Sequence, residues 1–253
     1  MKINAKSIFL FTLGLTYSAL GFSQTNAPQG LDAQMNLNRL ASGATSNVRV
    51  FDNRYEGVKG SPYFLESWAP GEIEIKANNT GKTEVIKDLK LKYDVFSNLL
   101  VAVIPQSKDT LQIGTQPVIS FRLDVPTGDN KLEFRRIKEA RELDPALSDA
   151  FFAVLYDSQN GKATVLKRIA KKKIEANFKG PYSAGQNYDE IVDETSYYVV
   201  ANGKMKKVKL NRKSLLEAFP EKADQIKSFI SSQKLAMSSE ADLIKAVTYY
   251  QSL

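Results

Sequence analysis

Leu89-Lys90-Leu91-Lys92-Tyr93-Asp94-Val95 alternates strictly between apolar and polar side chains, with the apolar ones at the odd numbers. A period of two is typical of a β-strand that buries one face and exposes the other. No other stretch of the chain shows this alternation as strongly. The body of the protein is therefore predicted to be a β-sheet.

Other strand-like runs lie on both sides of this segment. Residues 72–76 alternate in the same way, and a continuous apolar run over residues 99–104 ends at Pro105. The Asn-Gly dipeptides at residues 160–161 and 202–203 each separate two further runs, and Asn-Gly is favoured in two-residue hairpin turns. Hairpins in series imply an antiparallel sheet. The predicted fold class is α+β, with a mainly antiparallel β-sheet shaped as an open roll or half-barrel.

The pattern changes to helical spacing after residue 213. Leu215, Leu216 and Phe219 predict a short helix that Pro220 ends, and a second helical run follows. A third helix is expected after Ser239, whose hydroxyl can accept a hydrogen bond from a backbone N–H of the first turn. Helices this short are not stable alone, so we expect them to pack on the sheet.

The N-terminal residues have the layout of a secretory signal peptide. Lys2 and Lys6 precede a mostly apolar run over residues 8–20, and small residues follow at Gly21 and Ser23. The run is too short to cross a bilayer comfortably, and no later run approaches the roughly 18 apolar residues that would. We therefore expect an exported protein, periplasmic or extracellular, whose mature chain is soluble and has no transmembrane segment.

The sequence divides into four predicted parts. In chain order they are a signal peptide over residues 1–23, a loose polar leader over 24–47, an antiparallel β-rich domain over 48–213 and a helical segment over 214–253. Hydrophobic residues make up 43% of the sequence and charged residues 25%, which are ordinary globular values. A hydrophobic core is therefore expected to stabilise the mature protein.

The sequence contains neither His nor Cys. Ser-His-Asp and Cys-His catalytic groups are excluded because each needs an imidazole base. Zinc, copper, haem and iron–sulfur sites that depend on His or Cys are excluded as well. We predict no cofactor, no metal site and no catalytic residue, and any catalysis would have to use carboxylates, Lys, Tyr or a metal held by oxygen ligands.

Positive charge is concentrated in one part of the chain. Residues 162–213 contain 13 Lys or Arg against 5 Asp or Glu, a local net charge of +8. Such a patch can bind an anionic envelope component, whereas the export signal and the lack of a recognition motif argue against nucleic acid. Lysines on exposed strands can instead serve only to block edge-to-edge pairing. The candidate binding residues are Lys167, Arg168, Lys171, Lys172, Lys173, Lys206 and Lys207.

Two other groups of side chains are candidates for function. Tyr55, Tyr63 and Trp68 lie in a turn-rich aromatic stretch that could present a platform to a glycan, or could simply seal one end of the sheet. Glu72 with Glu74, and separately the acidic cluster over residues 189–194, could each supply the acid and base of a glycosidase. The acidic cluster could also hold Ca²⁺. For both sets of carboxylates, solvated acidic residues are the interpretation that we favour.

The tail of the sequence carries a set of recognisable motifs. They are Lys213-Ser214-Leu215-Leu216-x-x-Phe219-Pro220-x-Lys222, Ile226-Lys227-x-Phe229-Ile230 and Asp242-Leu243-Ile244, with Tyr249-Tyr250 close behind. Together with the turn at residues 60–63 and the hairpin over residues 155–167, they resemble a family of uncharacterised exported proteins from bacterial envelopes. The resemblance implies an envelope localisation and a shared fold, and it implies no functional residues.

Three classes of function remain open. The first is a non-enzymatic envelope protein that binds a partner protein, a lipid or a glycan, and this is the class that we favour. The second is a carboxylate-based glycoside hydrolase, which would show two carboxylates facing one another in a cleft. The third is a periplasmic lipid carrier, which would show a large apolar hollow inside the sheet.

Overall fold

The computed structural model describes residues 48–50, 55, 57–76, 83–103, 110–126, 131–158, 162–180 and 185–253. The expected signal peptide and leader lie outside the described residues, as does the dipeptide at 160–161. Within the described residues, eleven strands form one antiparallel sheet in the order β1-β5-β4-β3-β2-β6-β7-β8-β9-β10-β11. The strands are β1 (Val48–Val50), β2 (Ala69–Lys76), β3 (Thr83–Asp94), β4 (Leu99–Val103), β5 (Thr110–Gly114), β6 (Val118–Asp124), β7 (Lys131–Arg135), β8 (Phe152–Asp157), β9 (Ala163–Ile174), β10 (Glu190–Ala201) and β11 (Lys204–Val208).

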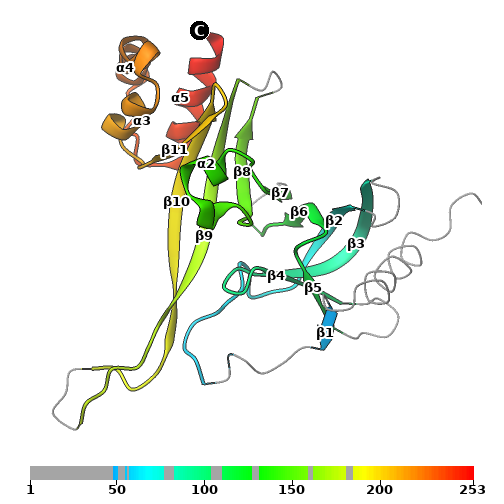
Figure 1. Ribbon diagram of the computed structural model, residues 1–253. Coiled ribbons are helices and arrows are strands. Elements are labelled where there is room, and N and C mark those ends of the chain that lie inside the picture. The colour runs from blue at the N-terminus through cyan, green and yellow to red at the C-terminus, as the bar shows by residue number, and fades with distance from the viewer. Residues whose placement is uncertain are drawn as a thin grey trace, which may run out of the picture.

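Short helices accompany the second half of the sheet (Figure 1). They are α2 (Ala140–Leu143), the 3-10 turn η1 (Pro145–Leu147), α3 (Arg212–Ala218), the 3-10 turn η2 (Pro220–Lys222), α4 (Ala223–Ser232) and α5 (Glu240–Ser252). The open antiparallel sheet with helices packed on it confirms the predicted α+β fold. α2 and η1 are too short for a helical period to show in the sequence.

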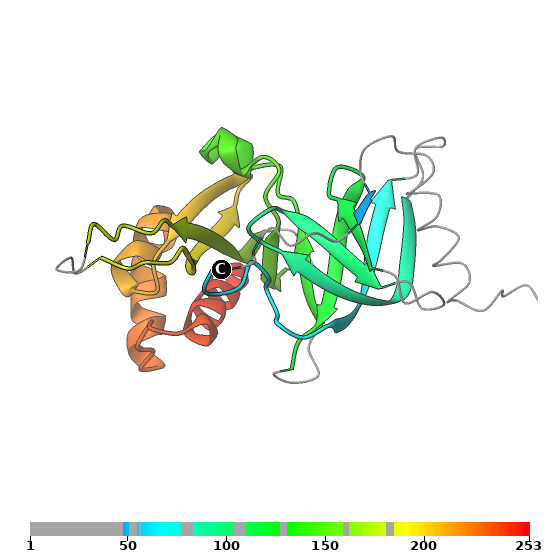
Figure 2. The same ribbon diagram turned by 90° about the horizontal axis from the view of Figure 1, so that it is seen from below.

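Strands β2 to β7 curve around an aromatic core (Figure 2). The rings of Phe121 and Phe134 stack with centroids 4.8 Å apart, and both side chains are buried. Tyr93 and Phe151 meet Phe121 edge to face at 5.0 and 5.1 Å. Edge-to-face and offset-stacked contacts are the arrangements that aromatic rings prefer. The interior of the curved sheet is therefore filled with side chains.

The alternation over residues 89–95 predicts burial correctly, with one exception. Leu89, Leu91 and Tyr93 are buried in the aromatic core, while Lys90 is exposed. Asp94, which alternation places outside, is also buried. Its carboxylate accepts hydrogen bonds from the hydroxyl of Tyr55 (2.9 Å) and the backbone N–H of Ser97 (2.8 Å), which compensate for its lost hydration.

Within the body, strands β8 to β11 are covered on both faces. Alternate residues of β9 point in opposite directions, so Val165 packs against helices α3 to α5 and Leu166 packs against α2 and η1. Helix α5 begins as predicted, since the hydroxyl of Ser239 accepts a hydrogen bond from the backbone N–H of Asp242. The predicted helical segment is thus docked on the sheet.

The turn between β10 and β11 has the predicted geometry. Asn202 and Gly203 both have positive φ, at 51° and 69°, and the residues on either side of them pair directly. Positive φ at both central positions is what a two-residue hairpin turn of this kind requires.

The longest feature of the sheet is a two-stranded ribbon that leaves the body (Figure 1). Strands β9 and β10 pair along their full length, but β8 pairs with β9 only up to Lys167, and β11 pairs with β10 only from Tyr197. Beyond these points the only other pairing described is an isolated bridge between Lys59 and Glu190. We call residues 170–180 and 185–194 the arm.

Candidate functional site

The aromatic candidates are divided between two places. The ammonium group of Lys92 lies over the rings of Tyr63 (4.7 Å to the centroid) and Trp68 (5.3 Å). Tyr55 instead directs its hydroxyl to Asp94 and its ring to Phe96. The aromatic stretch therefore forms a packed junction with β3, and the structure does not bring its three candidate rings into a single platform.

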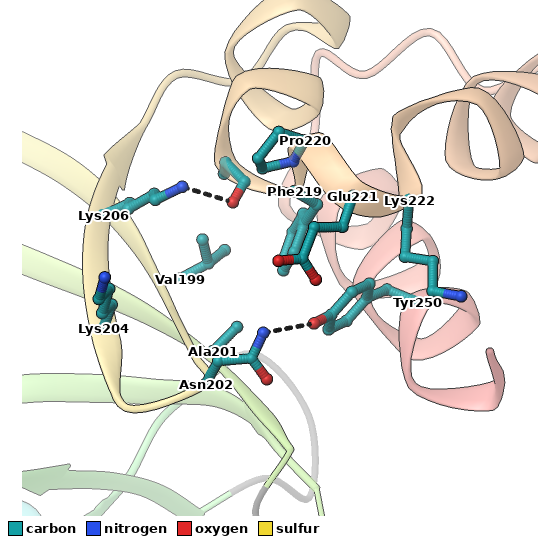
Figure 3. Close-up of a pocket in the computed structure, with 11 residues that line it drawn as sticks. Val199, Ala201, Asn202, Lys204, Lys206, Phe219, Pro220, Glu221, Lys222 and Tyr250 are labelled. Atoms are coloured by element: carbon teal, nitrogen blue, oxygen red, sulfur yellow. Dashed lines mark hydrogen bonds between the residues drawn. The ribbon is translucent and has the colours of Figure 1, made fainter.

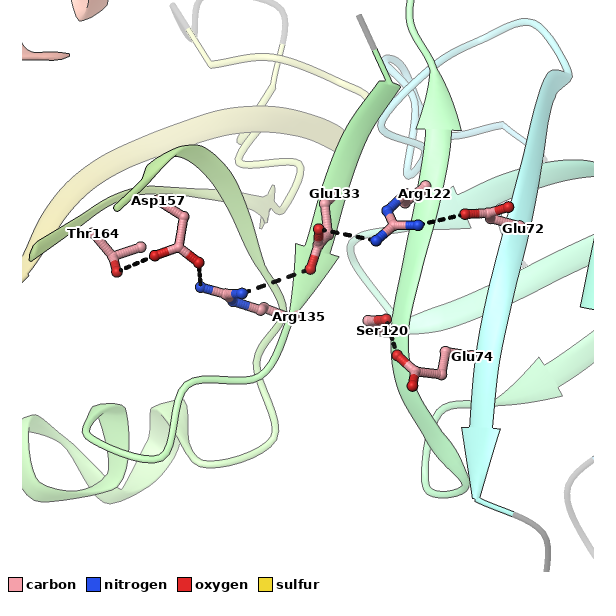
Figure 4. Close-up of polar contacts among 8 residues, drawn as sticks. All are labelled: Glu72, Glu74, Ser120, Arg122, Glu133, Arg135, Asp157 and Thr164. Atoms are coloured by element: carbon pink, nitrogen blue, oxygen red, sulfur yellow. Dashed lines mark hydrogen bonds and ion pairs between the residues drawn. The ribbon is translucent and has the colours of Figure 1, made fainter. Parts of the chain in front are cut away.

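The carboxylates of Glu72 and Glu74 are already held by neighbouring strands (Figure 4). Glu72 accepts a hydrogen bond from Arg122 at 2.6 Å, and this contact raises the pKa of Arg122. Glu74 accepts from the hydroxyl of Ser120 at 2.8 Å. Both carboxylates therefore already have hydrogen-bond partners on the neighbouring strand β6.

These contacts belong to a polar ladder that crosses five strands (Figure 4). From Arg122 the ladder continues to Glu133 at 3.5 Å, then to Arg135, and from Arg135 to Asp157 at 2.5 Å. Thr164 closes it by donating to Asp157 at 2.9 Å. Charges of alternating sign on adjacent strands stabilise strand pairing, so the ladder accounts for these residues structurally.

The acidic cluster over residues 189–194 pairs with two of the basic candidates of β9, Lys171 and Lys173. Asp193 lies directly opposite Lys171 in the strand register and forms an ion pair with it. Lys173 contacts Asp189 at 2.6 Å, and its hydrogen bond keeps the pKa of Asp189 below its usual value. Glu190 pairs with Lys59 at 3.3 Å. Along the arm, cations and acids therefore compensate one another.

The remaining basic candidates do not form one surface. Lys167 pairs with Glu240 of α5 at 2.8 Å, and Lys206 donates to the backbone carbonyl of Ala218 at 2.9 Å. In the strand register Lys206 shares a face with Val199, which packs against helices α3 to α5. Lys207 is opposite Tyr198, on the α2 side, and the parity of β9 places Arg168 and Lys172 there too. The sequence already contained this signal, because neighbouring residues of a strand face opposite ways.

Sequence reasoning overlooked the apolar side chains of the arm. Ile174 is 41% exposed, Phe178 51% and Tyr188 37%. They extend beyond the last residues of β9 and β10 that the body covers, and the ring of Tyr188 meets the ammonium of Lys59 at 5.0 Å. Large apolar side chains exposed together away from a core commonly mark an interaction site.

A pocket of about 340 Å³ lies at the opposite end of β10 (Figure 3). It is enclosed by the β10–β11 hairpin, the junction of α3 with η2 and the last turns of α5. Of the residues that line this pocket, only Lys206 is among the candidate binding residues predicted from the sequence. The others were missed because the pocket joins segments that lie far apart in the chain. The lining residues are Val199, Ala201, Asn202, Lys204, Lys206, Ala218, Phe219, Pro220, Glu221, Lys222 and Tyr250.

Comparisons with models of known protein families, with curated proteins and with solved structures find no match for this chain. Among the described residues, no helix is both long and apolar enough to span a membrane. The same residues contain no group of three or more acidic side chains arranged to hold a metal ion.

Proposed function

We propose that this is an exported, non-enzymatic envelope protein that binds a partner protein through its arm. One observation carries the proposal: Phe178, Ile174 and Tyr188 are all exposed, and all three belong to the ribbon that extends away from the body in Figure 1. Phe178 is the most exposed of the large apolar side chains described. Aromatic side chains that enter a pocket of a partner often dominate the binding energy of an interface.

The β9 edge of the ribbon supports the same proposal. An isolated pair of strands is only marginally stable in water. Beyond Lys167 of β9, the described residues provide no strand on the β8 side of the ribbon. The backbone groups along such an edge can pair with an extended segment of another protein. A partner protein would therefore both cover the exposed side chains and complete the ribbon.

The charge of the arm favours a protein over a lipid surface. Its described residues include four lysines and five acidic residues. Attachment to an anionic membrane draws on an excess of basic residues close to the surface. The acids along β10 would repel anionic headgroups, and the ion pairs of Lys171 and Lys173 occupy two of the four cations. An overall balance of charge is compatible with a protein interface.

Two features support a binding role over the alternatives. The carboxylates considered for glycoside hydrolysis are engaged: Glu72 with Arg122, Glu74 with Ser120, and Asp189 with Lys173. The interior of the curved sheet, where a lipid carrier would hold an acyl chain, is filled by buried aromatic rings. The hydrolase and the carrier thus lack the features that would favour them.

The test begins with crosslinking in cells. A photoreactive phenylalanine analogue is placed at residue 178 of the full chain, and in a matched chain at residue 96, where Phe96 is 40% exposed on the other half of the molecule. We expect one protein to be crosslinked at position 178 and not at 96. Crosslinks to lipid alone, or equal patterns at both positions, would overturn the proposal.

Binding of the identified partner to purified protein then provides the quantitative step. Phe178→Ala should weaken affinity by about 30-fold, the loss expected for a central aromatic anchor. Val85→Ala is the control, because Val85 is 50% exposed on β3 of the body. Affinity within twofold of wild type for Phe178→Ala would contradict a role for the arm.

Export is tested separately by cell fractionation and N-terminal sequencing. The protein is expected in the periplasm or the medium, with a mature N-terminus at or near Gln24. Recovery of a chain that retains Lys2 from a cytoplasmic fraction alone would contradict export and leave the binding experiment unaffected.

A further inference from the structure

The pocket at the β10–β11 hairpin is independent of the arm. Both features include part of β10, but they lie at its opposite ends: Glu190 belongs to the arm and Ala201 lines the pocket. Eleven residue steps along a strand correspond to roughly 36 Å at about 3.3 Å per residue. A ligand of the pocket therefore does not compete for the surface proposed to bind a partner protein.

The floor of the pocket is apolar. Phe219 is 4% exposed, Ala218 and Val199 are also buried, and all three line the pocket. The ring of Tyr250 lies against that of Phe219, with centroids 4.2 Å apart. Such a surface favours a ligand with an apolar or aromatic part.

The walls of the pocket carry opposite charges. Lys204 and Lys206 lie on the β11 wall, and the carboxylate of Glu221 lies across from them on the helix side (Figure 3). Among the described residues, Glu221 forms no ion pair with either lysine, so the charged groups face one another without contact. Lys206 is positioned by its hydrogen bond to the carbonyl of Ala218, and an ammonium group retains two further donors.

From this arrangement we infer that the pocket binds a small zwitterion, namely an α-amino acid with an apolar or aromatic side chain. Its carboxylate would contact Lys204 and Lys206, its ammonium would contact Glu221, and its side chain would lie on Phe219. The volume of about 340 Å³ is at the lower end of the range for ligand sites and fits a molecule of this size. On binding, the carboxylate and the ammonium of the ligand would each exchange water for a side chain of opposite charge. A purely anionic ligand would make only the first of these exchanges.

Calorimetric titration of the full chain with three probes tests this inference. L-Phenylalanine carries both charges, 3-phenylpropionate lacks the ammonium, and 2-phenylethylamine lacks the carboxylate. We expect L-phenylalanine to bind with a Kd of about 1 mM or tighter and each truncated probe to bind at least 5-fold more weakly. Equal binding of all three would mean that only the apolar floor is used, and absence of saturable binding by L-phenylalanine would also overturn the inference.

Two variants assign the charges to their walls. Glu221→Gln should weaken L-phenylalanine at least 5-fold and leave 3-phenylpropionate unchanged or tighter, whereas Lys204→Ala should weaken both. The matched controls are Glu217→Gln on α3 and Lys207→Ala, which is exposed on the opposite face of β11. All four substitutions are at exposed positions, so the variants should fold. Equal losses in the variants and their controls would show a general charge effect and refute the site.

Discussion

Replacing Phe134 with Ala tests whether the curved sheet is packed or hollow. Phe134 is 1% exposed and lies in β7 at the centre of the aromatic core. Its ring contacts those of Phe121 at 4.8 Å, Phe64 at 5.1 Å and Tyr93 at 5.5 Å. Truncation removes buried apolar surface and leaves a cavity that neighbouring backbone strands cannot fill.

The expected cost follows from this burial. Phe→Ala in a packed core costs about 3–5 kcal/mol of unfolding free energy. For a domain of this size each kcal/mol lowers Tm by about 2–4 °C, so a loss of about 4 kcal/mol lowers Tm by about 8–16 °C. The fluorescence of Trp68, the sole tryptophan of the chain, provides the measurement because it directly precedes β2. Coincident transitions by fluorescence and circular dichroism would establish that the comparison is two-state.

A matched substitution separates folding from binding. Phe178→Ala removes the same atoms from a ring that is 51% exposed on the arm, so Tm should change by no more than about 2 °C. A fall of less than about 4 °C for Phe134→Ala would refute the packing argument. It would indicate an interior loose enough to admit an apolar ligand, and the lipid carrier would become the better hypothesis.

Three further predictions concern the backbone and alkaline pH. Gly203→Val should destabilise the protein by about 1–3 kcal/mol in thermal unfolding, because φ at this position is +69°. Gly71→Ala should reduce the free energy of unfolding in urea by a similar amount, since a Cβ there would be 2.4 Å from the carbonyl oxygen of Arg122. A wild-type urea midpoint would contradict this steric clash. Burial, and then the hydrogen bond to Glu240, raises the pKa of Tyr197 to about 12. The stability that the neutral hydroxyl of Tyr197 contributes should be complete below about pH 10 and lost as the pH rises through about 12. Tyr197→Phe should therefore reduce the decline of Tm over that interval. An unchanged decline would exclude Tyr197 as a cause.

The parts of the fold that sequence predicts are those encoded by neighbouring residues. Alternation in β3 directly reports which side chains are buried, and the dipeptide at 202–203 specifies its own turn. Ser239 caps α5 through a contact only three residues away. Asp94 departs from the pattern, and one of its hydrogen-bond partners, Tyr55, comes from a segment 39 residues earlier, which no local rule detects.

The candidate sites depend on pairings that local patterns do not contain. Whether Lys171 is free or neutralised depends on its register with Asp193 across the whole connection between β9 and β10. The pocket joins the hairpin with Glu221 and Tyr250, which approach one another only when the helices dock. The separation of Lys206 from Lys207 could have been predicted, since the parity of β11 is visible in the sequence.

The same residue types have different roles at the two ends of β10 because of how they face one another. On the arm, Lys171 lies opposite Asp193 and Lys173 contacts Asp189, so these charges are satisfied within the fold. At the pocket, Lys204 and Glu221 belong to a strand and a helical turn that the apolar floor holds apart. Charges that cannot meet retain their capacity to bind a molecule placed between them. For the ligand that we propose for the pocket, the separation of opposite charges is therefore a better guide than local net charge.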